Sequence, residues 1–534
     1  MELLHSLRPF IMPTLVSLVL ACLALGAVSQ AFLWGLLFTL PLLLLGVHDR
    51  LQSRHSILRN YPVLGRLRFL LEGLGPELHQ YLVESNTSGR PFDRDYRNLI
   101  YERAKNIDGV KPFGTELDVY APGYGYISHS LAPKAIVEDA GKTIRVDVGG
   151  PQCDQPYSSS VVNISAMSFG ALSANAIRAL NGGARLGGFA HCTGEGGFSI
   201  HHREPGGDVI WQIGTGYFGC RKDDGSFDVE MFAEQAENPQ VKMVELKLSQ
   251  GAKPGHGGIL PGAKVTPEIA AARKVPVGED CFSPPGHSAF STPIELCEFL
   301  QTLRERSGGK PVGFKLCLGS PTDFFALCKA MIETEIAPDF ITVDGGEGGT
   351  GAAPQEYSDH LGMPLREGLF LVHNALVGIG IREDLRLAAS GKRVGSYDIA
   401  SAMALGANWC NVARSFMFSI GCIQSQSCHT NSCPVGVATQ DPSLQKALVV
   451  EDKVQRAFRF HANTVQGLAE MTAACGLNHP NEFRTKHLYE RVSPHEVRRF
   501  DQLYPTIEKG QLLENRAGTI LQKFWDEASA QRFA

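Results

Sequence analysis

The sequence has little that would suit a nucleic-acid-binding protein or a disulfide-bonded secreted protein. Its 50 basic and 55 acidic residues give a formal net charge of −5 over 534 residues, and no block of lysine and arginine stands out. A chain without such a block has no surface that follows a phosphate backbone, so we do not expect a nucleic-acid partner. Most of the 13 cysteines are isolated in apolar runs, which is typical of reduced core thiols in a reducing compartment.

Charge is also missing from one long stretch near the amino terminus. Residues 9–48 contain no Asp, Glu, Lys or Arg, and about 20 apolar residues suffice for one helical crossing of a membrane. The apolar core of a signal peptide is shorter, roughly 7–15 residues, so we predict a transmembrane hairpin over 1–48 that turns near 26–30. Short basic flanks stay in the cytoplasm, which predicts an inner-membrane protein with a cytoplasmic catalytic body. The flanking arginines are Arg8, Arg50, Arg54, Arg59, Arg66 and Arg68.

Three further segments follow the predicted hairpin. Residues 49–114 mix arginines with leucines and predict a helical juxtamembrane or linker region, which lies on the membrane surface or packs on the body. Residues 115–445 alternate short β-rich apolar runs with helix-like stretches, which predicts parallel strands with helical crossovers. Residues 446–534 predict a C-terminal helical extension that closes the body.

Glycines, charges and hydroxyl groups gather at the carboxyl end of each apolar run in 115–445. A (β/α)8 barrel keeps its active site at that end, whereas a doubly wound sheet shows one phosphate fingerprint near its first strand. No GxGxxG opens a strand–helix–strand unit, which argues against a built-in nicotinamide domain. The predicted fold is therefore α/β, a (β/α)8 barrel. Seven runs are predicted as strands: 159–167, 187–196, 241–251, 311–319, 339–349, 385–391 and 408–416.

The last two predicted strands end in loops that suit a phosphate group. Ser390, Gly391, Lys392 and Gly395 follow one strand, and Arg414 follows the next. Amides exposed by glycine beside a cation form a phosphate cradle, and loops after strands seven and eight are its usual place in this barrel. We predict that these residues bind the phosphate of flavin mononucleotide (FMN), with an ordinary Ser-Gly turn as the alternative.

Small residues and a lysine follow two other predicted strands. Met167, Ser168 and Gly170 are small or flexible enough for a flat ring to approach the backbone. Lys315 lies at a strand end, where a cation near the flavin N1 would stabilise an anionic reduced ring. A lysine inside an apolar run has little reason to be there unless it is paired or functional. These residues join the predicted FMN site.

Three cysteines lie within twelve residues, at Cys422, Cys428 and Cys433. Their spacing excludes a CxxC motif, and structural zinc usually needs a close CxxC pair plus two further ligands. Zinc bound by these cysteines and His429 stays open. Three thiolates without a fourth suit an iron–sulfur cluster with a missing corner. Because the loop follows the predicted phosphate strand, we expect the cluster to lie close to the flavin.

Several motifs together resemble the flavin-containing synthase domain of glutamate synthase, in the same order over roughly residues 115–440. They are ISAMSFGALS with the run that follows it to GGFS, ELKLSQGAKPGHGGILPGAKV, SPPGH, GGTGAAP, ASGKRVG and CIQSQSCHTNSCPVGVATQDP. The resemblance implies a (β/α)8 barrel with FMN and a [3Fe–4S] cluster on the three cysteines. It also implies reductive conversion of 2-oxoglutarate and ammonia to glutamate through 2-iminoglutarate.

The reaction that the resemblance implies also suggests candidate catalytic residues. Lys247, Lys253 and Arg414 would hold the two carboxylates of the oxo-acid, and Lys315 would lie beside the flavin. Glu195 in TGEGG would handle protons, with a buried structural glutamate as the alternative. The chain departs from the long members of the family at His256, where they carry an acidic residue, and at Tyr217, where they carry a basic one.

Two family domains and a hydride donor are not expected in this chain. The glutaminase domain of the long enzymes has no room before the hairpin, and their β-helical domain does not fit after the barrel. We therefore expect an external electron donor, a ferredoxin or a reductase subunit, and a separate glutaminase-type subunit or ammonia itself. The chain resembles the membrane-anchored, single-domain members of the family.

Two other functions stay open. One is a related flavin enzyme that uses another amine donor or acceptor, as in N-methylglutamate formation. The other is a membrane-tethered flavin and iron–sulfur electron relay without a substrate of its own. A relay would not need the GAKPGHGG and GGTGAAP loops, so the sequence favours an enzyme.

Overall fold

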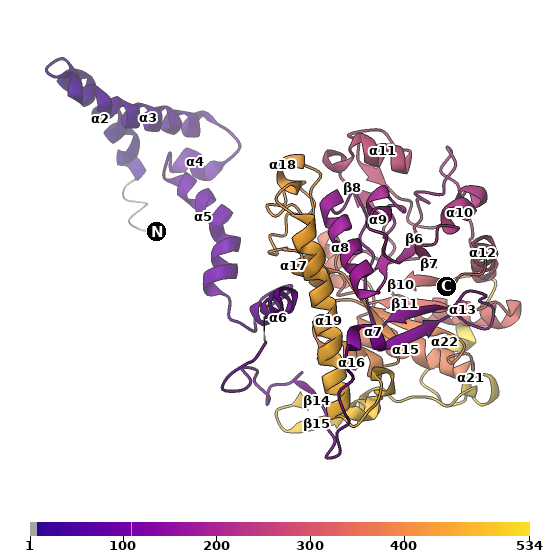
Figure 1. Ribbon diagram of the computed structural model, residues 1–534. Coiled ribbons are helices and arrows are strands. Elements are labelled where there is room, and N and C mark those ends of the chain that lie inside the picture. Colours follow the sequence, from indigo (N-terminus) through magenta and orange to yellow (C-terminus); the bar gives the residue numbers. More distant parts are fainter. Residues whose placement is uncertain (1–7, 108) are drawn as a thin grey trace. The chain divides into compact units, whose positions relative to one another are not determined.

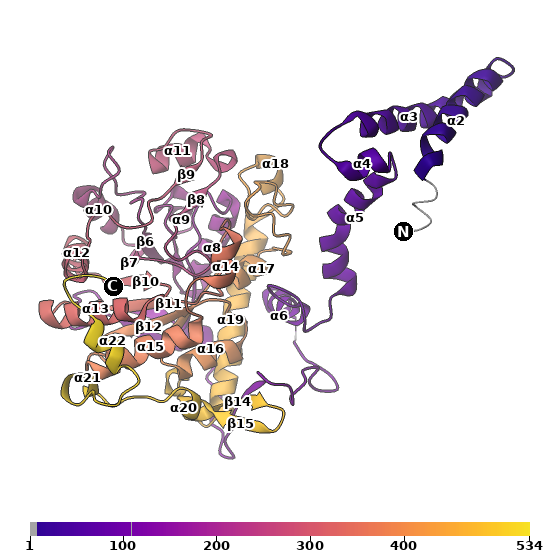
Figure 2. The same cartoon turned by 180° about the vertical axis from the view of Figure 1, so that it is seen from behind.

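The computed structural model describes residues 8–107 and 109–534, and residues 1–7, which begin the predicted transmembrane segment, lie outside the described residues. The chain divides into two compact units, Met1–Arg94 and Asp95–Ala534, and each is described by itself. Figure 1 labels the elements, and Figure 2 shows them from behind. The barrel strands all belong to the second unit.

The first unit consists of helices, and α2 packs against α3. A Cβ added at Gly46 of α3 would lie 2.6 Å from Met12 Sδ of α2, so glycine permits this close approach. One helix, Gln30–Leu51, is long and apolar enough to cross a membrane, and α2 is apolar but shorter. The two-helix transmembrane hairpin therefore stays a prediction. The bounds are η1 (Arg8–Phe10), α2 (Ile11–Gly26), η2 (Gln30–Gly35), α3 (Leu36–Leu51), α4 (Ser56–Asn60), α5 (Gly65–Leu78) and η3 (His79–Val83).

Eight parallel strands of the second unit close into a barrel, which confirms the predicted architecture. Nearly all residues of these strands are buried, as parallel strands with helices on their outer face require. The order around the barrel follows the chain, and β13 closes it by pairing with β4. The strands are β4 (Val162–Ile164), β5 (His191–Cys192), β6 (Val209–Ile213), β7 (Val241–Lys247), β10 (Val312–Leu316), β11 (Phe340–Asp344), β12 (Arg386–Ser390) and β13 (Trp409–Val412).

Helices connect these strands and surround the barrel, as Figures 1 and 2 both show. Local signals start several of them: Ser173 Oγ accepts from the Ala176 amide, and Thr292 with Glu295 forms a reciprocal capping box. The helices are α8 (Ala174–Gly187), α9 (Ile200–Arg203), α10 (Val229–Ala236), α11 (Pro267–Arg273), α12 (Pro293–Arg306), α13 (Pro321–Thr334), α14 (Gln355–His360), α15 (Leu365–Gly378), α16 (Ser396–Ala404) and α17 (Arg414–Ser419).

Strand β6 is the one barrel strand that the sequence analysis missed. Its sequence, VIWQI, carries a glutamine inside a short apolar run. Gln212 is nonetheless buried, because its Nε2 donates a hydrogen bond of 2.6 Å to Glu245 Oε2 inside the barrel. A polar residue that has its partner on a neighbouring strand is compatible with a buried strand.

The predicted C-terminal helical extension is correct only in part. The long helix α19 (Val450–Ala474) packs on α8, where a Cβ added at Gly183 would lie 2.6 Å from Ala457 Cβ. However, β14 (Leu488–Ser493) and β15 (Glu496–Arg499) form an antiparallel hairpin, and β14 also pairs with β1 (Gly125–Ile127). Pairing with a strand so far away in the sequence leaves no local pattern from which it could be predicted.

Short elements complete the second unit. β2 pairs with β3 at the amino ends of the barrel strands, and β8 pairs with β9. The bounds are α6 (Arg94–Lys105), α7 (Ala140–Thr143), β2 (Arg145–Val148), β3 (Tyr157–Ser160), β8 (Ile259–Leu260), η4 (Gly262–Lys264), β9 (Cys281–Phe282), α18 (Pro442–Gln445), η5 (Pro480–Glu482), η6 (Thr485–His487), α20 (Phe500–Leu503), α21 (Gln511–Glu514) and α22 (Gln522–Glu527).

Candidate active site

The carboxyl ends of the eight barrel strands meet at one end of the barrel, which we call the mouth. Three clusters of charged side chains lie there, and cations outnumber carboxylates in them. Such an excess suits an anionic ligand. The cations are Lys247, Lys253, Arg273, Lys315, Arg393 and Arg414, and the carboxylates are Glu195, Glu245, Asp344 and Glu347.

The first cluster is built around Glu195, which follows β5. Its Oε1 lies 3.0 Å from Nζ of Lys247, the last residue of β7. Burial alone would raise the pKa of the Glu195 carboxyl, but the positive charges of Lys247, Lys253 and Arg273 outweigh burial and the pKa is lowered. Glu195 is therefore ionised at neutral pH and can accept a proton.

Lys253 is the cation of this cluster that lacks a direct partner. The side chain is only 3% exposed, and no hydrogen bond or ion pair joins its Nζ to another of the described residues. Burial lowers the pKa of Lys253 to about 8, against the attraction of Glu195. A buried cation is costly unless something compensates its charge. Lys253 is thus the group at the mouth that most needs an anionic ligand.

Glycines allow two loops to close over Glu195. A Cβ added at Gly258, after β7, would lie 2.6 Å from Glu195 Oε1, and one at Gly214, after β6, would lie 2.7 Å from Glu195 Cβ. Real side chains do not approach this closely, so both positions need glycine. Part of the glycine content of the mouth is thereby explained by packing around one carboxylate.

The second cluster places Lys315 at the end of β10, beside Asp344 at the end of β11. Their Nζ and Oδ2 atoms lie 3.1 Å apart, and Asp344 also accepts from the Gly251 amide at 2.9 Å. Burial would lower the pKa of Lys315, but Asp344 and Glu245 raise it above its ordinary value. Lys315 is therefore a fixed cation near the carboxyl end of β10.

Beneath this pair, Glu245 of β7 is held by neighbouring strands. Thr342 Oγ1 donates to Glu245 Oε1 at 2.6 Å, and Gln212 Nε2 donates to Oε2 at 2.6 Å. A carboxylate with both oxygens satisfied inside the barrel is compatible with burial. This polar layer forms the floor of the mouth.

The third cluster joins the loops after β11, β12 and β13. Arg414 Nη2 donates to the Glu347 carbonyl at 2.9 Å. Burial lowers the pKa of Arg414 to about 10, so its guanidinium stays charged at neutral pH. Gly391 has φ of +126°, and a Cβ there would lie 3.2 Å from the Gly345 amide nitrogen. The backbone of two loops therefore meets closely at Gly391 and Gly345, with the Glu347 carboxyl carbon 3.7 Å from the Cβ position of Gly391.

The other predicted phosphate-binding residues are placed differently. Ser390 Oγ lies 3.3 Å from Ser165 Oγ, across β12 and β4, and its own strand is buried. Lys392 is half-buried with φ of +49°. The Gly395 amide donates to Asp398 Oδ2 at 3.0 Å, which caps α16. That amide is therefore already used within the protein, and it is not available to a phosphate group.

The loop after β4 carries the predicted ring-binding residues beside the first cluster. Met167 is buried, and a Cβ added at Gly194 would lie 2.8 Å from the Ser168 amide nitrogen. Gly170 has φ of +105°, and a Cβ there would lie 3.1 Å from Arg273 Nη2. The structure therefore brings Met167, Ser168 and Gly170 to the Glu195 side of the mouth.

Tyr217 and His287 form a hydrogen-bond chain that ends at Lys247. His287 Nε2 must donate to the Lys247 carbonyl at 2.9 Å, so its Nδ1 accepts from the Tyr217 hydroxyl at 3.1 Å. The same hydroxyl accepts from the Ala289 amide at 3.1 Å. Tyr217 thus contributes no charge, and it holds the loop after β9 against the end of β7. His256, the other departure from the family pattern, bonds the Gly257 carbonyl at 2.9 Å and contacts the Tyr357 ring edge to face.

The three cysteines follow α17 and gather in one loop. Burial raises the pKa of the Cys422 thiol to about 12, and the nearby Cys428 and Cys433 thiols add to the rise. Over residues 8–107 and 109–534, no three His, Cys, Asp or Glu side chains lie close enough to ligate one metal ion. That finding gives no support to the zinc alternative with His429.

Gln440, at the end of the cysteine loop, and Lys264 of η4 both bond to the loop after β4. Gln440 Nε2 donates to the Gly170 and Leu172 carbonyls at 3.0 and 2.8 Å. The buried Lys264 donates to the Ala171 carbonyl at 3.0 Å. Burial lowers the pKa of Lys264 to about 8, while the nearby Cys428 and Cys433 oppose that change. The cysteine loop therefore lies next to the loop that carries Met167 and Ser168.

Sequence reasoning missed five charged residues of the mouth: Arg273, Arg393, Glu245, Asp344 and Glu347. Arg273 comes from α11 and reaches the Phe169 carbonyl at 3.1 Å, which no local pattern reveals. Glu245 and Asp344 did carry a signal, because each is a carboxylate inside a run of otherwise apolar strand residues. Such a residue is seldom fully buried unless it is paired.

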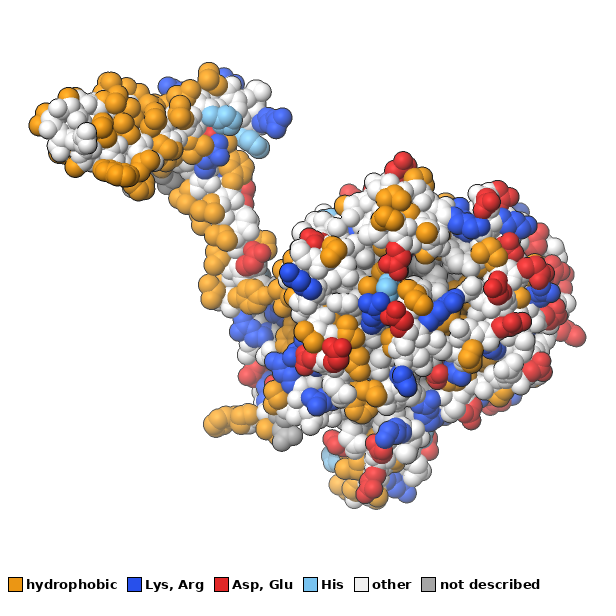
Figure 3. Space-filling view, turned by 45° about the horizontal axis from the view of Figure 1, so that its top comes forward, with side chains coloured by type: hydrophobic (Ala, Val, Ile, Leu, Met, Phe, Trp, Pro, Cys, Tyr) orange, Lys and Arg blue, Asp and Glu red, His pale blue; other side chains and the backbone are white. Residues whose placement is uncertain are grey.

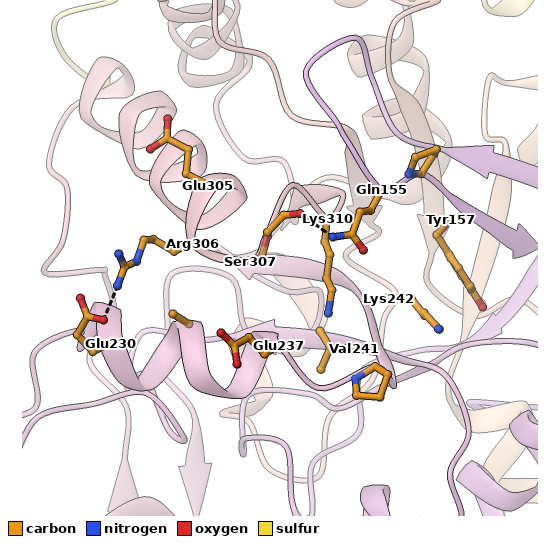
Figure 4. Close-up of a pocket in the computed structure, with 14 residues that line it drawn as sticks. Gln155, Tyr157, Glu230, Glu237, Val241, Lys242, Glu305, Arg306, Ser307 and Lys310 are labelled. Carbon is orange, nitrogen blue, oxygen red and sulfur yellow. Dashed lines mark hydrogen bonds and ion pairs between the residues drawn. The ribbon is translucent and has the colours of Figure 1, made fainter.

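The opposite end of the barrel holds a cavity of about 790 Å³. Figure 4 shows that side chains of both charges line it, among them Lys310, Arg306 and Glu230. Its strand residues lie in β3 and at the amino end of β7, so it is separate from the mouth. None of the predicted site residues lines this cavity.

The chain is similar to known proteins along most of its length. A family model described as a conserved region in glutamate synthase matches residues 152–478. A glutamate synthase large subunit-like protein of Bacillus subtilis is 39% identical over 514 residues, which cover 89% of this chain and 97% of that protein. An archaeal-type NADPH glutamate synthase of Thermotoga maritima is 34% identical over 400 residues, 74% of each chain. The archaeal NADPH glutamate synthase of Methanocaldococcus jannaschii is 33% identical over 321 residues, 59% of each.

Proposed function

The chain belongs to the glutamate synthase family and is an oxidoreductase, and we propose that it forms L-glutamate from 2-oxoglutarate and ammonia. The observation that carries this proposal is the first cluster of the mouth. Lys247, Lys253 and Arg273 surround one ionised carboxylate, Glu195, and one of these cations has no direct partner. Cations around a single base suit a dicarboxylate that must exchange protons.

Besides 2-oxoglutarate and ammonia, the proposed reaction needs only a source of two electrons and two protons. Ammonia adds to the C2 carbonyl of 2-oxoglutarate, and loss of water gives 2-iminoglutarate. The imine then takes up two electrons and a proton at carbon, and a proton at nitrogen gives the amine. Lys253 and Arg273 would hold the carboxylates in place, and Glu195 would exchange the protons at nitrogen.

Two features of the residues at the mouth fit the binding of FMN. The backbone of Gly391 closely approaches that of Gly345, and Arg414 is hydrogen-bonded to the same loop through the Glu347 carbonyl, which suits a phosphate group. Lys315 is a fixed cation on the adjacent strand β10. We assign the phosphate to Gly391 and Arg414, with Ser390 and Lys392 beside them, and the ring to the Met167–Ser168 side. The chemistry that bound FMN supplies is two-electron reduction and oxidation.

We also propose a [3Fe–4S] cluster on Cys422, Cys428 and Cys433. Such a cluster takes one thiolate for each iron, so its sulfurs stand farther apart than the ligands of a single ion. The Cys428 and Cys433 thiols lie near enough to Cys422 to add to the rise of its pKa, and the Lys264 ammonium is near Cys428 and Cys433. Electron paramagnetic resonance of the anaerobically purified protein, with iron analysis, distinguishes three irons from four or from none.

The remaining proposals concern the electron and nitrogen donors and the location of the protein in the cell. Electrons come from a separate protein, a ferredoxin or a reductase subunit, and nitrogen comes as ammonia or from a glutaminase-type subunit. Helix Gln30–Leu51 supports anchoring in the inner membrane, with the barrel in the cytoplasm on the side of the arginine-rich flank.

A second candidate is the same reductive chemistry with another amine, such as methylamine. The Tyr217 hydroxyl is hydrogen-bonded to His287 Nδ1 and to the Ala289 amide. It adds no positive charge at the position where the long members of the family carry a basic residue. One experiment separates the two. The purified protein is reduced anaerobically and mixed with 2-oxoglutarate plus ammonia, methylamine or glutamine. Reoxidation with ammonia supports the first proposal, reoxidation with methylamine alone supports the second, and no reoxidation refutes both.

A further inference from the structure

Helix α5 of the first unit presents an exposed apolar face. Five leucines recur at intervals of three and four residues, so they share one side of the helix. Each is 43–57% exposed. Arg68 and Glu72 lie away from this face and pair with each other at 2.7 Å. Figure 3 shows hydrophobic side chains gathered over this unit. We call the five the leucine face: Leu67, Leu70, Leu71, Leu74 and Leu78.

The first turn of α5 is fixed to the end of the membrane-length helix. The carboxylate of Asp49, near the end of α3, is fully buried and accepts from Arg66 Nη2 at 2.6 Å and from the Val63 amide at 3.0 Å. These bonds tie residues at the start of α5 to one level of α3. The position of the leucine face along the Gln30–Leu51 helix is therefore defined within this unit.

The length of the Gln30–Leu51 helix puts its last turn, and with it the start of α5, at the edge of a bilayer. The 22 residues of Gln30–Leu51 extend for about 33 Å at about 1.5 Å per residue, close to a hydrocarbon core of about 30 Å. The ion pair of Asp49 and Arg66 stands at the last turn of this helix, where headgroups and water begin. A helix that starts there, with an apolar face along its length, has the form of an interfacial helix.

The charge of the segment indicates which lipid surface it fits. Between residues 49 and 72 the chain carries five arginines and two carboxylates. An excess of arginine next to a membrane helix favours the anionic headgroups of the cytoplasmic leaflet. The arginines are Arg50, Arg54, Arg59, Arg66 and Arg68.

We propose that α5 lies along the membrane surface with its leucine face buried at the boundary between anionic headgroups and acyl chains. This inference rests on the proposed membrane anchoring and extends it to a second, peripheral contact. The barrel of the same chain or a second copy would be the alternative cover for the leucine face, and the test below separates them.

The test places a photoreactive amino acid, p-benzoylphenylalanine, at single positions of the full chain. Position 71 lies on the leucine face, the adjacent position 72 lies off it, and position 42 reports insertion of the Gln30–Leu51 helix. Each protein is reconstituted in vesicles of phosphatidylethanolamine and phosphatidylglycerol, irradiated and analysed by mass spectrometry. We expect lipid adducts at positions 42 and 71, with at least fivefold fewer at position 72.

Each other outcome overturns the inference in a distinguishable way. Lipid adducts at 42 without adducts at 71 refute the interfacial helix and leave the anchoring intact. Adducts at neither position refute both. Cross-links from position 71 to peptides of residues 95–534 show that a barrel covers the face, and equal labelling at 71 and 72 shows that no face is selected.

A charge variant provides a second check. Leu67→Glu with Leu74→Glu should reduce lipid labelling from position 71 several-fold while labelling from position 42 and the visible absorption spectrum stay unchanged. Glu72→Gln, off the leucine face, is the matched control and should change none of these. Unchanged labelling in the double variant contradicts the proposal.

Discussion

The two ends of the barrel differ in how one buried lysine is satisfied. At the amino end, Lys310 donates to the backbone carbonyls of Ala236 and Asn238, and Arg304 pairs with Asp339 at 3.1 Å. At the mouth, Lys253 is equally buried, yet none of the described residues hydrogen-bonds its Nζ. A satisfied cation stabilises the fold, whereas an unsatisfied one is available for a ligand.

A similar difference separates Asp339 at the amino end from Glu195 at the mouth. Asp339 accepts from the Gly150 and Val312 amides at 2.8 Å each as well as from Arg304, so every strong acceptor site is filled from within the chain. Glu195 has one ion pair, to Lys247, and lies among three positive charges. The charges of the amino end are therefore satisfied within the chain, whereas Lys253 at the mouth is the cation that we assign to a ligand.

The largest expected effect is on stability at the amino end. Arg304→Met would leave Asp339 buried without its cation, which should lower the free energy of unfolding by about 3–5 kcal/mol. Chemical denaturation of the detergent-solubilised protein measures this change. Lys509→Met, which removes an exposed pair with Glu383, should cost less than about 1 kcal/mol. Similar losses in the two variants would contradict the structural role of Arg304.

The next effect is on catalysis at the mouth. Lys253→Met should lower kcat/KM for 2-oxoglutarate by about 10²–10³-fold, as expected when a preorganised cation at the reacting ligand is lost. Its stability should not fall, because the buried charge has no direct partner to lose. Lys310→Met at the amino end should keep kcat/KM within about twofold and lose about 1–3 kcal/mol of stability. The reverse pattern would refute the distinction between the two ends.

These two ends also show what the sequence could and could not predict. The barrel and most of its strands follow from apolar runs that end in glycine and charge. Lys315 was recognised because it breaks such a run, whereas Lys253 and Glu195 were named as charged residues of glycine-rich loops. Strand β6 escaped because Gln212 interrupts it, although its partner Glu245 lies on the next strand.

Residues that act through long-range contacts could not be predicted from local sequence. Arg273 belongs to an ordinary helix end and becomes part of the mouth only because α11 folds over the loop after β4. The pairing of β14 with β1 likewise depends on tertiary structure. Gly395 looked like a phosphate ligand, but Asp398 takes its amide as a helix cap. Spacing along the chain cannot show which amides are already used.

The pH dependence of substrate binding should sharpen the contrast further. The pKa of Lys253 is about 8 in the free protein, so its cationic fraction falls about tenfold per pH unit above that value. The KM for 2-oxoglutarate should rise accordingly between pH 8 and 10. Because the folded pKa lies below the ordinary value, the unfolded chain binds more protons in this window, and Lys253 opposes folding less as pH rises. The Lys253→Met variant lacks the titrating ammonium, so its KM should not show this rise between pH 8 and 10.

The smallest expected effect concerns the chain of Tyr217 and His287. Tyr217→Phe removes the hydroxyl that serves His287 Nδ1 and the Ala289 amide, at a cost of about 1–3 kcal/mol in stability. KM should rise only a few-fold, because the loop after β9 loosens without losing a charge. Thermal unfolding and steady-state kinetics measure both. A change of more than a hundredfold in kcat would mean that Tyr217 contacts the reacting groups directly.

The most direct test of the central claim is a calorimetric titration of 2-oxoglutarate into the oxidised full-length protein at pH 7. Wild type and Lys310→Met should bind with the same affinity, and Lys253→Met should bind at least tenfold more weakly. Equal binding by all three proteins, or weaker binding by Lys310→Met alone, would contradict the assignment of the mouth as the oxo-acid site.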